Sequence, residues 1–224
     1  MTSEVKLYKI PEILETARIL DDSVLEKYND SFQDYNEKAR QTLGEFGRAD
    51  GELTGSSPFM LVHLANSGLL PSDSRLATRK DLETATQYSP EFLSGRYVDF
   101  GLVLKTAGDS HAPNDFLSKR LAEQLKQRNI VLGNGKLIPL NALTLAQNND
   151  SAYGLVFDLN GEAKNLIRDL AEFNWSYTKD SGLACACLSC DRDWNSVNVR
   201  LNSGSDGRVV VVNAEGTSQN SNNL

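Results

Sequence analysis

The residue types best suited to chemistry gather in one short stretch of the chain. The three cysteines of the 224-residue sequence, Cys185, Cys187 and Cys190, lie within it, and Asp191 and Asp193 follow them directly. Thiolates are ligands for zinc, and a carboxylate can complete a tetrahedral set. The stretch is therefore a candidate metal site, with the three thiols and Asp191 as its ligands.

The same residues have a simpler interpretation as packing. Leu183, Cys185 and Cys187 alternate with small residues, which predicts a strand over 183–188 with both thiols on one face. Free cysteine is among the most buried residue types. A four-thiolate zinc module needs a second cysteine pair, which the sequence lacks. Cys187 and Cys190 have redox spacing, but that motif normally opens a helix. We therefore expect packed thiols, with no metal and no cofactor.

The loop at residues 109–115 is the second candidate site. Asp109, His111 and Asp115 could form a metal-binding or acid–base group, with the hydroxyl of Ser110 beside them. Loops that follow strand ends often carry binding and catalytic residues. Polar side chains in such loops more commonly hydrogen-bond to the nearby backbone. We favour this second interpretation of the loop.

The composition limits the classes of partner. The formal charge of −7 and the pI of about 4.9 argue against a general affinity for nucleic acid. The uninterrupted apolar runs of the sequence, such as residues 209–212, are far too short to cross a bilayer. The amino-terminal residues show no secretory signal, and an odd number of cysteines suits a reducing compartment. We therefore expect a soluble cytoplasmic protein without membrane or nucleic-acid partners.

An aromatic-rich stripe dominates the amino-terminal part. The apolar positions step by threes and fours: Leu25, Tyr28, Phe32, Tyr35, Ala39, Thr42 and Phe46. This spacing predicts an amphipathic helix over residues 25–46. The helix could pack on its own domain, or it could form a helical hairpin or dimer surface.

The rest of the chain changes from helical to mixed patterning. Predicted strands and helices alternate along it: strands 97–106, 136–146, 153–159, 183–188, 197–201 and 208–212, and helices 114–128 and 162–173. This predicts an α+β fold, with an antiparallel sheet covered by two helices and preceded by amino-terminal helices. The order resembles a ferredoxin-like split βαβ arrangement with extra carboxyl-terminal strands.

The predicted domain organisation follows changes in composition. A Gly- and Ser-rich connector at residues 44–57 separates a helical region, 1–50, from an α+β domain, 51–213. Residues 214–224 lack apolar patterning and are predicted to be a disordered tail.

Two classes of function remain open at this level. The first is a non-enzymatic interaction or self-associating protein that uses the predicted helix 25–46 as its contact surface. The alternative is a small-molecule or metal-dependent enzyme that uses the 109–115 loop or the Cys185–Asp193 stretch.

Overall fold

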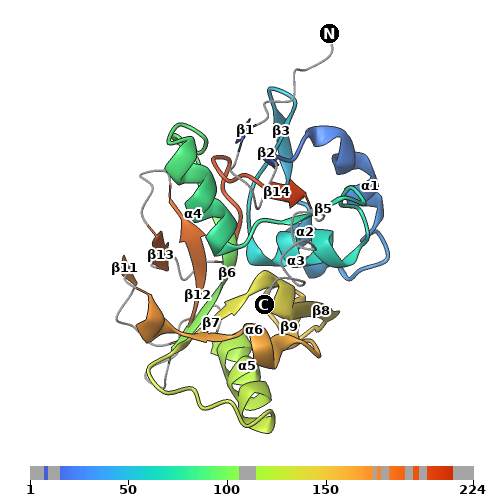
Figure 1. Cartoon of the computed structure of the whole chain (residues 1–224). Coiled ribbons are helices and arrows are strands. Elements are labelled where there is room, and N and C mark those ends of the chain that lie inside the picture. Colours follow the sequence, from blue (N-terminus) through green and yellow to red (C-terminus); the bar gives the residue numbers. More distant parts are fainter. Residues whose placement is uncertain are drawn as a thin grey trace.

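The computed structural model describes residues 8–9, 16–105, 115–173, 176–177, 182–189, 194–196 and 201–213. Within these ranges the chain is α+β, and its sheets are almost entirely antiparallel (Figure 1). This confirms the predicted fold class. None of the helices in the described ranges has the length and apolar character needed to cross a membrane.

A six-stranded sheet forms the centre of the molecule, in the order β10-β7-β6-β12-β13-β11. Its strands are β6 (Val98–Lys105), β7 (Lys136–Pro139), β10 (Arg168–Asp169), β11 (Ser176–Tyr177), β12 (Gly182–Leu188) and β13 (Trp194–Ser196). Neighbouring strands are antiparallel, apart from the parallel pair β11 and β13. Every residue of β6 is buried, as its apolar sequence predicts for a central strand.

A second sheet joins distant parts of the chain, in the order β1-β2-β14-β5. Its strands are β1 (Tyr8–Lys9), β2 (Thr16–Ile19), β5 (Ser74–Leu76) and β14 (Val210–Asn213). Two hairpins complete the strands: β3 (Gly47–Ala49) with β4 (Glu52–Thr54), and β8 (Leu143–Gln147) with β9 (Leu155–Leu159).

Helices cover both faces of the central sheet. They are α1 (Leu25–Asp30), α2 (Glu37–Leu43), α3 (Pro58–Asn66), α4 (Arg79–Tyr88), α5 (Asp115–Gln127) and α6 (Ala163–Leu166). Short 3-10 turns lie at η1 (Asp22–Val24), η2 (Leu140–Ala142) and η3 (Leu170–Glu172). The predicted helix 114–128 and strands 97–106 and 153–159 are thus confirmed, as α5, β6 and β9.

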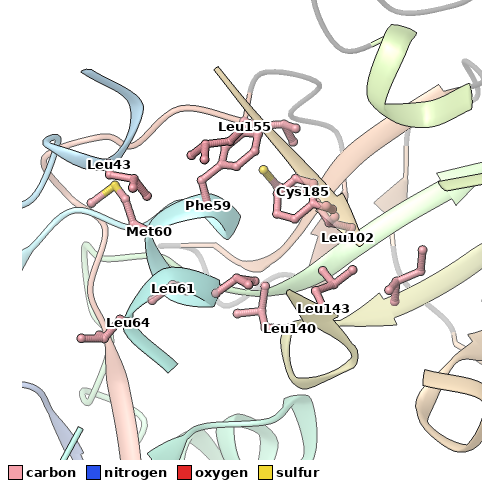
Figure 2. Close-up of a cluster of buried hydrophobic side chains, with 14 of the residues drawn as sticks. Leu43, Phe59, Met60, Leu61, Leu64, Leu102, Leu140, Leu143, Leu155 and Cys185 are labelled. Carbon is pink, nitrogen blue, oxygen red and sulfur yellow. The ribbon is translucent and has the colours of Figure 1, made fainter. Parts of the chain in front are cut away.

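The buried apolar side chains form two cores, one on each face of β6. The first core joins α1, α2, α3 and α5 to the β8–β9 hairpin and includes Leu102 and Leu104. Figure 2 shows part of it, including Phe59 of α3 and Cys185 of β12. The second core lies beneath α4 and includes Phe100 and Val103. β6 therefore supplies side chains to both cores.

The predicted continuous helix over residues 25–46 is wrong, because a turn separates α1 from α2. Ser31 ends α1, and its hydroxyl donates a hydrogen bond to the carbonyl of Tyr28 at 2.6 Å. Asn36 begins α2, and its Oδ1 accepts from the backbone N–H of Ala39 at 3.0 Å. Such side-chain bonds to the backbone favour helix ends over helix interiors. The stripe is nevertheless buried within the chain's own first core.

The predicted helix 162–173 is also wrong. Only α6, residues 163–166, is helical, and the next residues form β10 and η3. Arg168 and Asp169 pair with β7, and the ammonium group of Lys136 contacts the carboxylate of Asp169. Strand pairing and this ion pair override the helical pattern of the sequence. The expected extended segment 136–146 is interrupted by η2, which separates β7 from β8.

The ferredoxin-like order is not confirmed. That arrangement places two parallel strands side by side, joined by a crossover helix. Here α5 joins β6 to β7, which are antiparallel neighbours. The predicted strand 197–201, apart from Leu201, and the predicted tail 214–224 lie outside the described residues.

The predicted boundary near residue 50 falls in the turn of the β3–β4 hairpin. Residues on both sides of it contribute to the first core, and β2 pairs with β14. The division into two domains stays a prediction, which unfolding of a Tyr28→Ala variant would test.

Candidate functional site

A β-bulge in the central sheet determines which side chains each face receives. On β12, Ala186 pairs with Gly101, but the next residue, Cys187, pairs with Asp99, so the register passes over Phe100. An extra residue of this kind redirects the neighbouring side chains. As a result, Phe100 joins the second core while the Asp99 carboxyl hydrogen-bonds to Cys185, a residue of the first core.

Gly101 allows the bulge to lie against β7. A Cβ at this position would lie 2.7 Å from the carbonyl oxygen of Ile138 and 3.3 Å from the Cα of Pro139. Both are backbone atoms, which cannot move aside as the end of a flexible side chain can. The close approach of β7 to the bulge therefore requires glycine here.

Asp99 is the most perturbed carboxyl group in the described chain. Its side chain is 4% exposed, and its backbone N–H donates to the hydroxyl of the fully buried Ser56 at 3.0 Å. Burial raises the pKa of Asp99 to about 7, although hydrogen bonds from Ser56 and Cys185 oppose that rise. A buried carboxyl disfavours its charged form because the protein solvates an anion less well than water does. Asp99 can therefore take up or release a proton near neutral pH.

Tyr97 connects this buried group to the loop before β14. Its hydroxyl donates to the carbonyl of Ser56 at 3.0 Å and accepts from the backbone N–H of Gly204 at 2.7 Å. Burial, and then the nearby Asp99, raise the pKa of Tyr97 above its ordinary value. Tyr97 therefore remains a neutral donor at all ordinary pH values.

The structure confirms the predicted strand with packed thiols. Cys185 and Cys187 are buried thiols on β12 and form no disulfide. Leu183 and Cys185 belong to the first core, and Ala186 and Leu188 to the second, as strand alternation predicts. Burial and the adjacent Asp99 raise the pKa of Cys185 well above its ordinary value. The thiol is therefore neutral at physiological pH.

The structure describes only some residues of the two sites that the sequence predicts. Cys190, Asp191 and the loop residues 109–114 lie outside the described residues. Asp115 is the first residue of α5, and its carboxylate contacts the ammonium group of Lys119 at 2.8 Å. Across the described ranges, no group of three or more His, Cys, Asp or Glu side chains could hold a metal ion.

The state of the thiols gives a direct prediction. In a Cys190→Ser variant, Cys185 and Cys187 should react with Ellman's reagent at least about 100-fold more slowly than free cysteine at pH 7.5, because only an exposed thiolate attacks. Unfolding in guanidinium should release both thiols at the rate of free cysteine. Two rapidly reacting thiols in the native protein would contradict the assignment.

A cavity of about 650 Å³ opens on the other side of the bulge, between α4 and β7. We call it the basic groove. Its apolar floor and walls come from Phe100, Leu137, Pro139, Leu166 and Phe173, and its polar lining comes from Thr78, Arg79, Lys80, Glu83, Asn141 and Arg168. A volume of this size lies within the range of small-molecule sites, about 300–1,000 Å³.

The charges around the basic groove are predominantly positive. Arg79 contacts the carboxylate of Glu83 at 2.8 Å, and its guanidinium lies 4.3 Å from the ring centre of Phe173. Lys80 and Arg168 lie at the rim, and both are exposed. Three cations and one carboxylate leave two positive charges, in a chain whose formal charge is −7. The groove is thus a local positive region on an acidic protein.

A second cavity, of about 440 Å³, adjoins the first. We call it the side cavity. It shares Thr78, Phe100, Pro139 and Asn141 with the basic groove, and it continues along β5 towards the end of α3. Its one cationic side chain, Arg75, forms an ion pair with the buried Asp81. The side cavity therefore carries little net charge.

Comparison with models of known protein families, with curated proteins and with solved structures found no match. The geometry of the chain alone must therefore indicate its function. No single sequence pattern indicates the basic groove, because its lining comes from four separate segments of the chain. The adjacent cations Arg79 and Lys80 are a local sign of positive charge. In the sequence, the nearby acids Asp81 and Glu83 balance that charge and hide the sign.

Proposed function

We propose that this chain is a non-enzymatic binding protein whose basic groove holds a small anionic molecule. The observation that carries the proposal is the placement of Arg79, Lys80 and Arg168 around an apolar cavity of about 650 Å³. Apolar walls supply most of the affinity of a small-molecule site, and a few polar groups orient the ligand. Here those polar groups select for negative charge.

Arg168 is positioned to receive an oxyanion. Its Nη1 donates to the carbonyl of Asn165 at 2.6 Å and to that of Ile167 at 3.1 Å. These two bonds hold the guanidinium at the rim through one nitrogen, so Nε and Nη2 can reach a ligand. A guanidinium matches the geometry of a carboxylate or phosphate, and such charge-assisted bonds are about twice as strong as neutral ones.

Calorimetric titration with three matched probes tests the proposal. Hexanoate should bind measurably, whereas hexanamide and hexylammonium, which have chains of the same length, should not. Arg168→Gln and Lys80→Gln should each weaken hexanoate binding by roughly tenfold, as expected for loss of a charge-assisted hydrogen bond. Lys126→Gln, an exposed change on α5 outside the groove, should leave it unchanged. Equal binding of hexanamide, or no effect of Arg168→Gln, would refute the proposal.

An enzyme remains a second candidate, and one observation favours it. The pKa of Asp99, raised by burial to about 7, is the value that suits a general acid or base at neutral pH. Cys185 lies within hydrogen-bonding reach of its carboxyl group. The thiol measurement separates this candidate from the first. Rapid labelling of Cys185 in the native chain would favour the enzyme, because it would demonstrate access to the buried group.

The protein-partner role that the sequence predicts for residues 25–46 has less structural support. Tyr28, Phe32 and Phe46 are at most 7% exposed, so their apolar area is already buried within the chain. The exposed side chains of this segment are largely charged, which favours solvent contact. We therefore propose that binding occurs in the basic groove. We also propose a cytoplasmic location, which the absence of a disulfide at Cys185 and Cys187 supports.

A further inference from the structure

We infer that the ligand is a linear amphiphile, with a terminal oxyanion in the basic groove and an unbranched alkyl chain in the side cavity. This inference rests on the proposed function and adds a ligand class to it. The two cavities differ in charge, adjoin one another, and share four lining residues. A molecule that occupies both must therefore be charged at one end only.

The basic groove is the compartment that suits the charged end. Arg79, Lys80 and Arg168 line it, against one opposing carboxylate. In the side cavity, Arg75 is already neutralised: its guanidinium contacts both carboxylate oxygens of Asp81, which also accepts from the hydroxyl of Thr78 at 2.8 Å. A second anion there would compete with Asp81, so the head group belongs in the basic groove.

The side cavity suits an apolar chain. Its lining is mainly apolar or small: Ala65, Leu70, Pro71, Leu76, Ala77 and Leu140. A ligand that fills this cavity from the basic groove has to pass Phe100 and Pro139, which line both compartments. The β-bulge, whose extra residue is Phe100 itself, directs the Phe100 ring to this junction. A flexible alkyl chain can adapt to such a bend, and it gains free energy for each methylene group that leaves water.

A chain-length series tests the inference. Calorimetry would compare butanoate, hexanoate, octanoate and decanoate with alkyl phosphates of the same lengths. Each added methylene group should tighten the dissociation constant by roughly three- to fourfold, the factor expected for one buried CH₂. If the binding free energy changes with alkyl length by the same amount in both series, the alkyl chain is recognised independently of the oxyanion. The difference between the series would then identify the preferred head group.

A variant that blocks the side cavity tests whether the alkyl chain of the ligand occupies it. Ala65 is exposed on α3 and lines that cavity only, so Ala65→Phe should fill it without disturbing the core. Decanoate binding should weaken about 10-fold or more, towards that of butanoate, while butanoate binding stays unchanged. Ala49→Phe, a matched change at an exposed position of β3, should affect neither ligand.

The outcomes separate the inference from the proposed function. Affinity that does not change with chain length, or decanoate binding that Ala65→Phe leaves intact, would overturn the amphiphile inference. The proposed function would survive either result if hexanoate still required Arg168. No binding of any carboxylate or phosphate in the series would overturn both.

Discussion

Replacing Tyr28 by alanine should lower the free energy of unfolding by about 3–5 kcal/mol, the range for removing a large aromatic side chain from a core. Tyr28 is fully buried in α1. Its ring makes edge contacts with Phe32 and Phe46, at centroid distances of 5.2 and 4.7 Å. Its hydroxyl donates to the carbonyl of Leu43 at 3.1 Å, so the variant also leaves a buried acceptor without its bond.

The same residue connects the amino-terminal helices to the rest of the protein. The Tyr28 ring lies 5.5 Å from the imidazole of His63 on α3, and Phe32 contacts that imidazole at 5.8 Å. Nε2 of His63 is also 2.7 Å from the hydroxyl of Ser31. Because these contacts cross the predicted boundary near residue 50, we expect Tyr28→Ala to shift one unfolding transition of the whole chain.

Thermal and guanidinium unfolding, followed by circular dichroism, measures the effect. Tyr88→Ala is the matched control, since this tyrosine is 55% exposed on α4 and its loss should cost less than about 0.5 kcal/mol. Two resolved transitions in the Tyr28 variant would show instead that residues 1–50 unfold separately, as the sequence-predicted domain division implies.

Replacing Asp99 by asparagine should stabilise the protein at pH 8. Burial raises the pKa of this carboxyl to about 7 in the folded chain, whereas an unfolded aspartate titrates near pH ~4. The folded state therefore binds the proton more tightly. The stability that the protonated Asp99 carboxyl gives the folded state is complete below about pH 4. It is lost as the pH rises from ~4 to ~7, and it is absent at higher pH.

The size of the effect follows from the difference between the two pKa values. About three pH units, at ~1.4 kcal/mol for each, correspond to roughly 4 kcal/mol of stability that the ionised carboxylate removes. Asparagine has nearly the same shape and can accept one of the hydrogen bonds, but it carries no charge. The stability of Asp99→Asn relative to the native chain should therefore rise by about 2–4 kcal/mol between pH 4 and pH 8.

Other groups also titrate in this range, so the comparison must be between the two proteins at each pH. Burial lowers the pKa of His63, which stabilises the fold above pH ~6.5 and loses that contribution as the pH falls. This dependence has the opposite sign to that of Asp99, and it cancels when variant and native unfolding energies are subtracted. A difference that stays constant from pH 4 to pH 8 would refute the assignment of Asp99.

Local patterns in the sequence correctly predicted the helices and strands whose buried faces match those patterns. The largely apolar sequence of β6, the amphipathic face of α5 and the alternation around Cys185 all identified real elements. The predicted helices 25–46 and 162–173 failed where a distant partner or a side-chain cap decides the structure. Asn36 interrupts the first, and pairing with β7 replaces the second.

The candidate sites depend on contacts between residues far apart in the sequence to a greater extent than the helices and strands do. The bulge that redirects Phe100 has one local sign, Gly101, and a lone glycine in a strand does not indicate which neighbours approach it. Asp99 meets Ser56 and Cys185 from two other segments of the chain, and its raised pKa arises from burial, against which the hydrogen bonds of these two residues act. Neither property is encoded in any single stretch of the chain.

The position of β14 has a consequence for how the protein is made. This strand pairs with β2 on one side and β5 on the other, so neither can complete its sheet before β14 is translated. At about 5–20 residues per second, β2 waits on the order of 10–40 s for its partner. During that interval the nascent chain presents unpaired strand edges, which readily associate with other chains. Efficient biosynthesis should therefore depend on chaperones that shield the amino-terminal third until the last strand arrives.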